Sequence, residues 1–141
     1  MKAAAWLRAA IASAGMLAAG AALACGHCVE DRIAAVYDHA SVQRALAARH
    51  QVAYFAWDGA MARDEALRRK LVSLAETVPG VDKGSVRVSM EPAAIAVSFD
   101  PQRGDRAAIG AALQKKMKAL SVETVPLEAP AAPLLTSAPR S

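Results

Sequence analysis

The spacing of hydrophobic residues changes repeatedly between residues 51 and 127, and this alternation constrains the fold more than any other feature. Short runs rich in β-branched and aromatic residues favour strands, whereas longer runs with apolar residues every three or four positions favour amphipathic helices. Turn signals such as Asp58-Gly59 and Pro79-Gly80 separate several of these runs. The pattern predicts strands over 51–57, 85–90, 94–99 and 122–127, and helices over 63–78 and 105–120.

This order of elements predicts an α+β fold of the ferredoxin-like βαββαβ type, in which two helices cover one face of a sheet. The strand at 51–57 is apolar on both sides, so we expect it to be central and covered on both faces. The strand at 85–90 alternates apolar and polar residues, so one of its sides is expected to face water. A further helix is predicted over 29–48, and we expect it to dock on the other face of the sheet.

Residues 1–24 have the organisation of a secretory signal peptide. A short basic segment precedes an uncharged, Ala-rich apolar run that ends in Ala22-Leu23-Ala24. Because this run is shorter than the about 20 apolar residues of a membrane-spanning helix, cleavage and export are favoured over retention as an anchor. Lipidation of Cys25 is a further alternative, although Leu23 fits a lipobox poorly. The sequence therefore predicts a periplasmic protein, with lipid-anchored or membrane-tethered forms as alternatives.

The predicted mature chain carries little net charge. The whole chain has a formal charge of +4, and removal of Lys2 and Arg8 with the signal peptide lowers it to +2 because residues 1–24 contain no acid. No basic run is interleaved with aromatic residues, so nucleic acid is not an expected partner. The expected organisation is a signal peptide (1–24), a motif with a helix (25–49), a ferredoxin-like domain (50–127) and a disordered tail (128–141).

The segment Cys25-Gly26-His27-Cys28 contains both cysteines of the chain and one of its three histidines. Two thiols at the start of a helix can converge on one ion, and the helix dipole favours their thiolate forms. Thiolates are soft ligands that select Cu(I), Zn and similar ions. A closed zinc site needs four ligands, whereas Cu(I) can be held by two thiolates, so Cu(I) is favoured and Zn or another soft metal is the alternative. The predicted metal ligands are Cys25, His27 and Cys28.

The same tetrapeptide allows other interpretations. If cleavage exposes the amino group of Cys25, that amine, two backbone amides and the His27 imidazole can surround Cu(II) or Ni(II). Cys25 and Cys28 can also form a redox pair, since Cys-Gly-His-Cys occurs at the active site of disulfide-isomerase-type thioredoxin domains. A plain surface disulfide is a third interpretation. No other set of residues typical of an active site occurs, so the sequence favours a protein that is not an enzyme.

Three segments resemble the heavy-metal-associated domains of copper chaperones and P-type metal ATPases. They are 78–81 (Val-Pro-Gly-Val), 86–92 (Val-Arg-Val-Ser-Met-Glu-Pro) and 94–101 (Ala-Ile-Ala-Val-Ser-Phe-Asp-Pro). The resemblance covers about half of the chain and implies binding of Cu(I) or another soft ion. In that family, the loop between the first strand and the first helix reads Gly-Met-x-Cys-x-x-Cys. Here Arg63 and Ala66 stand where the two cysteines belong.

The N-terminal motif is similar to the cysteine motif and helix start that this family carries in its loop. The expected function is therefore soft-metal handling, chaperoning or sequestration by an exported protein that uses Cys25, His27 and Cys28. Its expected partners are a soft metal ion and a membrane metal transporter or another periplasmic protein. A periplasmic thiol–disulfide redox protein and a non-catalytic interaction module of a metal-transport system are the alternatives.

Overall fold

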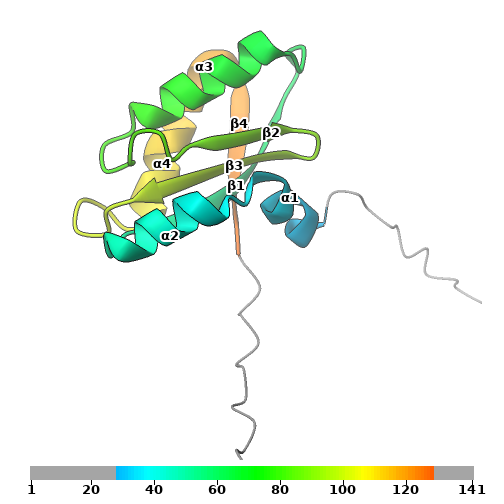
Figure 1. The fold of residues 1–141 in the computed structure, drawn as a ribbon. Coiled ribbons are helices and arrows are strands. Elements are labelled where there is room, and N and C mark those ends of the chain that lie inside the picture. Colours follow the sequence, from blue (N-terminus) through cyan, green and yellow to red (C-terminus); the bar gives the residue numbers. More distant parts are fainter. Residues whose placement is uncertain (1–27, 129–141) are drawn as a thin grey trace, which may run out of the picture.

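A four-stranded antiparallel sheet forms the centre of the computed structural model, which describes residues 28–128 (Figure 1). The predicted signal peptide, Cys25, His27 and most of the predicted tail lie outside the described residues. The elements in chain order are α1 (Val29–Val36), α2 (His39–Ala47), β1 (Gln51–Gly59), α3 (Glu65–Glu76), β2 (Arg87–Met90), β3 (Ala93–Phe99), α4 (Arg106–Met117), a short 3-10 helix η1 (Lys118–Leu120) and β4 (Val122–Leu127).

The strand order is β2-β3-β1-β4, and every neighbouring pair is antiparallel. With one helix between β1 and β2 and another between β3 and β4, this topology is the ferredoxin-like α+β fold that the sequence predicts. The four strands are all found close to their predicted ranges. No helix among the described residues combines the length and the apolar character needed to cross a lipid bilayer.

The main core lies between the sheet and the helices α3 and α4. Ala53, Phe55 and Trp57 alternate along β1 and point into this core, and none of them is more than 2% exposed. The apolar side chains along one face of α3 and one face of α4 pack against these three side chains, as the helical spacing predicts. The core side chains of α3 and α4 are Leu67, Leu71, Ala75, Ile109, Leu113 and Met117.

An aspartate caps the start of each of these two helices. The Asp64 carboxylate accepts a hydrogen bond from the Leu67 N–H at 2.8 Å, and the Asp105 carboxylate accepts one from the Ala108 N–H at 2.7 Å. Such bonds satisfy N–H groups that have no partner within the helix. The predicted cap at Asp105 is therefore confirmed, and Asp64 sets the start of α3.

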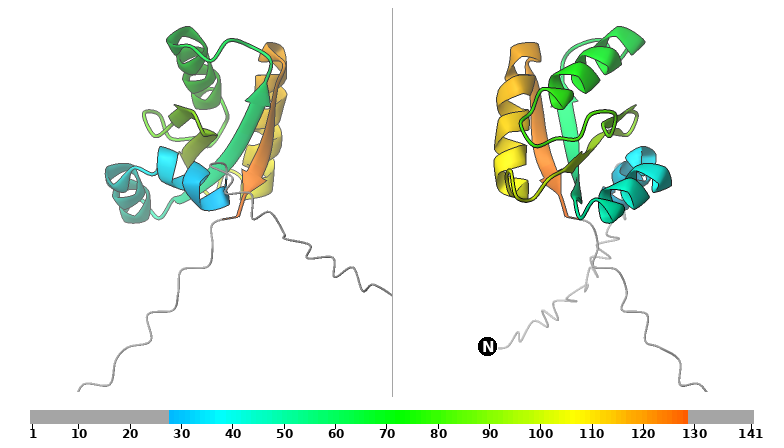
Figure 2. Two further views of the ribbon diagram at one scale, coloured as in Figure 1. Left: turned by 90° about the vertical axis from the view of Figure 1, so that its right-hand side faces the viewer. Right: turned by 60° about the vertical axis from the view of Figure 1, so that its left-hand side comes forward.

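The other face of the sheet carries α1 and α2, which lie on the side away from α4 (Figure 2). The prediction of one helix over 29–48 is wrong in this respect, because the chain adopts an extended conformation at Tyr37 and Asp38. Asp38 then caps α2, and its carboxylate accepts bonds from the Ala40 N–H at 3.1 Å and the Ser41 hydroxyl at 2.7 Å. The docking of this segment on the second face is confirmed.

The strand that is buried on both faces of the sheet is β3 rather than β1, contrary to the expectation for 51–57. All seven residues of β3 are buried, whereas β1 alternates between half-buried and buried positions from Val52 to Trp57 and is exposed at Gln51 and Asp58. The prediction that β1 is central is correct, since it pairs with both β3 and β4. The expectation that one side of 85–90 faces water is wrong at Ser85, which is buried. It is met only in part at Arg87, whose side chain is 38% exposed and whose guanidinium lies 2.7 Å from the Asp38 carboxylate at the start of α2.

The strand β2 begins two residues later than predicted. The Ser85 hydroxyl accepts a hydrogen bond from the Ser98 N–H at 3.0 Å and donates one to the Asp82 carbonyl at 2.7 Å. A side chain thus takes the place of a backbone bond to the neighbouring strand at this point, and the regular pairing starts at Arg87, opposite Ala96.

Candidate metal centre

Cys28 is the residue immediately before α1, and its side chain is exposed. Its carbonyl accepts a bond from the Arg32 N–H at 3.1 Å, so the first helical turn begins directly after the cysteine. The Cys28 side chain makes no capping hydrogen bond to the helix. The structure therefore places the second cysteine of the predicted motif where the sequence expects it, at the head of a helix and open to solvent. Cys25 and His27 lie outside the described residues.

Two carboxylates follow this thiol in the sequence, but among the described residues they form no metal site with it. Glu30 and Asp31 occupy the first turn of α1, where acids are favoured by the helix dipole, and both are exposed. Within residues 28–128, no group of three or more His, Cys, Asp and Glu side chains is arranged to hold a metal ion. An ion at this place would accordingly depend on Cys28 together with the residues that precede it.

The loop between β1 and α3 contains an arginine, Arg63, and no cysteine. The Arg63 guanidinium lies over the Trp57 ring, 5.0 Å from its centroid. The same group donates to the Met90 carbonyl at 2.9 Å and to the Glu91 carboxylate at 3.1 Å. Trp57 is fixed in turn, because its indole N–H donates to the Ser89 carbonyl at 3.0 Å. This loop is thus organised by a guanidinium bound to the turn between β2 and β3.

Arg32 reaches the same turn from α1. Its guanidinium donates to the Ala93 carbonyl at 2.7 Å, across a sequence separation of 61 residues. Figure 1 shows α1 beside the end of the sheet at which β2 and β3 are joined. Arg32, Trp57, Arg63 and Ala93 all line one hollow of about 490 Å³ at this end of the sheet. No local sequence pattern links Arg32 to Ala93, so this contact was not among the predicted features.

The remaining imidazole and thioether side chains have other surroundings. His39 starts α2 and lies 3.4 Å from the Tyr37 hydroxyl, at the surface. His50 follows α2, and its Nδ1 lies 2.8 Å from the Asp82 carboxylate, a partner that sequence spacing did not indicate. Met90 is half-buried against the core. Met61, in the loop after β1, is 40% exposed and is therefore accessible as a soft side chain.

In the layer formed by α1 and α2, the carboxylate of Asp38 has the most strongly shifted pKa among the described residues. The hydrogen bond from Ser41, aided by the nearby Arg87 guanidinium, lowers the pKa of Asp38 from 3.8 to about 2. The carboxylate is thereby ionised under all but strongly acidic conditions. It caps α2 and pairs with β2 at the same time.

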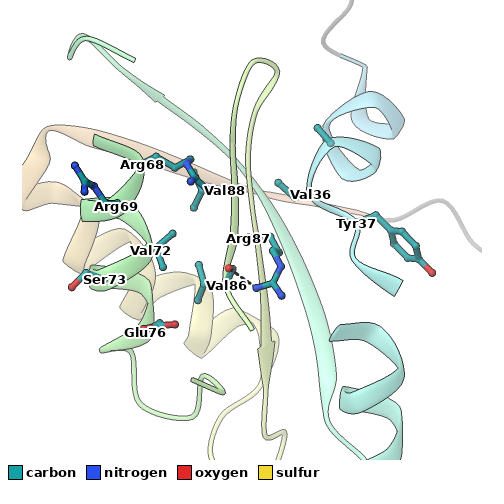
Figure 3. Close-up of a pocket in the computed structure, with 11 residues that line it drawn as sticks. Val36, Tyr37, Arg68, Arg69, Val72, Ser73, Glu76, Val86, Arg87 and Val88 are labelled. Atoms are coloured by element: carbon teal, nitrogen blue, oxygen red, sulfur yellow. Dashed lines mark hydrogen bonds between the residues drawn. The ribbon is translucent and has the colours of Figure 1, made fainter. Parts of the chain in front are cut away.

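A groove of about 580 Å³ runs along the open edge of β2, between α1 and α3 (Figure 3). In Figure 3, Val86 and Val88 point toward α3, whereas Arg87 points toward α1. Arg87 bonds to Asp38 and also donates to the carbonyls of Gly84 and Val86. Arg87, one of three arginines that line the groove, therefore already has acceptors, and no cysteine is among the lining residues.

No protein-family model and no curated protein matches the sequence. Among solved structures, the chain is similar to oxidized MerP from Ralstonia metallidurans CH34, with 19% identity, a TM-score of 0.45 and coverage of 56% of this chain and 99% of MerP. It is also similar to a copper binding domain from HMA7, a P-type ATPase, with 18% identity, a TM-score of 0.44 and coverage of 55% and 93%. At these identities the likeness concerns the fold alone.

Proposed function

We propose that this protein binds a soft metal ion, with Cu(I) favoured, through the thiols of Cys25 and Cys28. The observation that carries the proposal is the position of Cys28. Its side chain is exposed at the head of α1, so an ion can reach the sulfur from solvent. Cys25 lies three residues earlier in the sequence and supplies the second soft ligand, and His27 lies between them.

The chemistry of the remaining residues supports a thiolate site at this place. The chain has two cysteines, both in this motif, and the loop after β1 contains Arg63 held between Trp57 and the β2–β3 turn. A closed zinc site needs four ligands, whereas Cu(I) can be held by two thiolates. Zn or another soft ion is the alternative, with His27 or a carboxylate of the first helical turn as an added ligand.

The predicted signal peptide supports a periplasmic location for this activity, which is part of the same proposal. A protein of this kind handles, chaperones or sequesters the ion. It passes the ion to or from a membrane metal transporter or another periplasmic protein. An exposed thiol at a helix head suits such an exchange, because an incoming thiolate can reach the bound ion without unfolding of the sheet.

The test is competitive Cu(I) titration of the reduced protein against a chromophoric chelator. Wild type should bind one equivalent. The double variant Cys25→Ser/Cys28→Ser should lose more than about 100-fold in affinity, because even changes around a ligand cost about 10–100-fold. Met61→Leu serves as the matched control for the exposed thioether and should bind as wild type does. Unchanged Cu(I) affinity in the double variant would contradict the proposal.

A separate assay distinguishes the redox alternative. A dithiol that exchanges electrons with protein disulfides accelerates insulin reduction and the refolding of scrambled proteins. We expect wild type to show no more activity in these assays than a small free dithiol at equal concentration. Activity well above that level, lost in both single cysteine variants, would favour a thiol–disulfide redox function over metal handling.

A further inference from the structure

The outer edge of β2 has no neighbouring strand among the described residues, because β2 stands at one end of the sheet. The register with β3 shows which backbone groups point outward. The Ser98 N–H donates to the Ser85 hydroxyl at 3.0 Å, and the Ser98 carbonyl accepts from the Asp82 N–H at 2.8 Å. Both backbone groups of Ser98 therefore point to the β2 side of β3.

The alternation of an antiparallel pair fixes the residues that follow. Ala96 and Ala94, two and four residues before Ser98 in β3, also point to the β2 side and stand opposite Arg87 and Ser89. Arg87 and Ser89 thus form their backbone bonds with β3. The N–H and the carbonyl of Val88, between them, are directed away from the sheet.

The carbonyls on either side of Val88 already have donors. The Val86 carbonyl accepts from the Arg87 guanidinium at 3.0 Å, and the Met90 carbonyl accepts from Arg63 at 2.9 Å. Val88 is therefore the point of β2 at which an added strand can form both backbone bonds.

This point lies in the groove of about 580 Å³ between α1 and α3. In Figure 3 the Val88 side chain points toward α3. Val72 lines the groove from α3, and Val36 lines it from α1. A free strand edge beside apolar side chains is the arrangement that binds an extended peptide by strand addition.

The charged side chains of the groove favour an acidic occupant. Arg69 is exposed and makes no hydrogen bond or ion pair within residues 28–128. Arg68 gives two of its nitrogens to Glu65, and its second terminal nitrogen has no acceptor among these residues. Glu76 is the one acid among the described lining residues, and its carboxylate already accepts from the Gly84 N–H at 2.9 Å.

We propose that β2 is a docking edge for an extended acidic segment of another protein, which joins the sheet as a fifth strand. Its backbone bonds to Val88, its apolar side chains contact Val72, and its carboxylates pair with Arg69 and Arg68. The undescribed ends of this chain cannot supply these carboxylates, because 1–27 and 129–141 contain no acid. The β2 strand of a second copy contains an arginine and no acid, so charge opposes pairing of two copies.

The test uses the full chain and a labelled peptide of sequence Glu-Glu-Val-Thr-Val-Thr-Glu-Glu. Its valines match the apolar wall, and its terminal acids can reach Arg69 in either chain direction. Fluorescence anisotropy gives the affinity, and NMR gives amide hydrogen exchange. In the free protein the Val88 N–H should exchange faster than those of Arg87 and Ser89. Bound peptide should slow exchange at Val88 by at least about tenfold.

Two variants with the same charge change test the electrostatic part. Arg69→Glu should weaken peptide binding by about fivefold or more, since attraction is replaced by repulsion. Lys70→Glu is the matched control, because Lys70 is the next residue of α3, is exposed and does not line the groove. It should weaken binding by less than about twofold, as a screened distant charge does.

Modified peptides test the backbone part. Only alternate N–H groups of an added strand face β2. One peptide N-methylated at both valines and one N-methylated at both threonines should therefore differ, with binding lost in one of them and kept in the other. A peptide with Lys in place of every Glu should bind far more weakly than the acidic one.

Several results would overturn the proposal. They are no binding at millimolar peptide, equal binding of the Lys peptide, protection of β4 instead of Val88, and equal losses in Arg69→Glu and Lys70→Glu. Slow exchange of the Val88 N–H in the free protein would also overturn it. A dimer by light scattering would then identify a second copy as the occupant, and a monomer would identify a terminus of the chain itself. Cu(I) binding by Arg69→Glu should equal that of wild type, so these outcomes are separate from the proposed function.

Discussion

The Arg87 guanidinium lies 2.7 Å from the Asp38 carboxylate and joins the edge strand β2 to the start of α2. Because Asp38 also accepts bonds from Ala40 and Ser41, one carboxylate both caps a helix and holds it against the sheet. Among the described residues, the buried members of the apolar cluster beneath α1 and α2 are Val36, Ala94 and Ala96, with Tyr54 packed against them. The Asp38–Arg87 contact therefore adds a polar attachment to this small apolar cluster.

The first prediction concerns pH. The pKa of Asp38 is lowered from 3.8 to about 2 in the folded protein, so its ionisation stabilises the fold above pH 3.8. That contribution is lost as the pH falls through the interval from about 4 to about 2. We expect amide hydrogens of α2 to exchange faster, relative to those of α3, across this interval. Asp38→Asn should abolish the difference between the two helices. Glu65→Gln, which removes an acid paired with Arg68 on α3, should preserve it.

A second prediction compares the packing of the main core, between the sheet and α3 and α4, with that of the α1–α2 layer. Leu71→Ala removes a fully buried side chain of the main core and should lower the free energy of unfolding by about 2–5 kcal/mol. Val36→Ala removes less buried surface and should cost roughly 1–2 kcal/mol. Urea unfolding gives both values. Hydrogen exchange should show that Val36→Ala loosens α1 selectively, and uniform loosening of α3 and α4 in that variant would argue against a separate layer.

A third prediction concerns the contact between Arg63 and Trp57. Arg63→Ala removes the guanidinium from the ring and from the Met90 carbonyl, and should cost about 1–2 kcal/mol in thermal or urea unfolding. The emission of Trp57 should change at the same time. Arg69→Ala, at an exposed position of α3, is the control and should alter neither quantity. Equal effects of the two substitutions would show that the contact contributes nothing specific.

A fourth prediction follows from the cap position of Cys28. Serine is among the best residues at this position because its hydroxyl accepts a bond from an N–H of the first turn, whereas Cys28 makes no such bond. Cys28→Ser should therefore slow hydrogen exchange in α1 and stabilise the helix by roughly 0.5–1 kcal/mol. Cys28→Ala should show no such gain. Destabilisation of α1 by the serine substitution would indicate that the sulfur contributes to its packing.

Sequence reasoning predicted the sheet and the two core helices because their apolar spacing changes at each turn of the chain. It missed the break between α1 and α2, since Val36 and Ala40 keep their helical spacing across it. A local signal was available, because Asp38 is followed three residues later by Ser41, which bonds to the cap. The contact from Arg32 to Ala93 left no such signal, since it spans 61 residues and one partner is a backbone carbonyl. The ligand role of Cys25, His27 and Cys28 remains a prediction from sequence.

The turn between β2 and β3 receives guanidinium donors from two separate parts of the chain, Arg32 in α1 and Arg63 in the loop after β1. Loops at the ends of hairpins normally tolerate substitutions and insertions. Here an inserted residue would displace the carbonyls of Met90 and Ala93 together, and so disturb both the thiol-bearing helix and the loop beside Trp57. The length of this short connection should therefore be as restricted as a position in the core, although most of it lies at the surface.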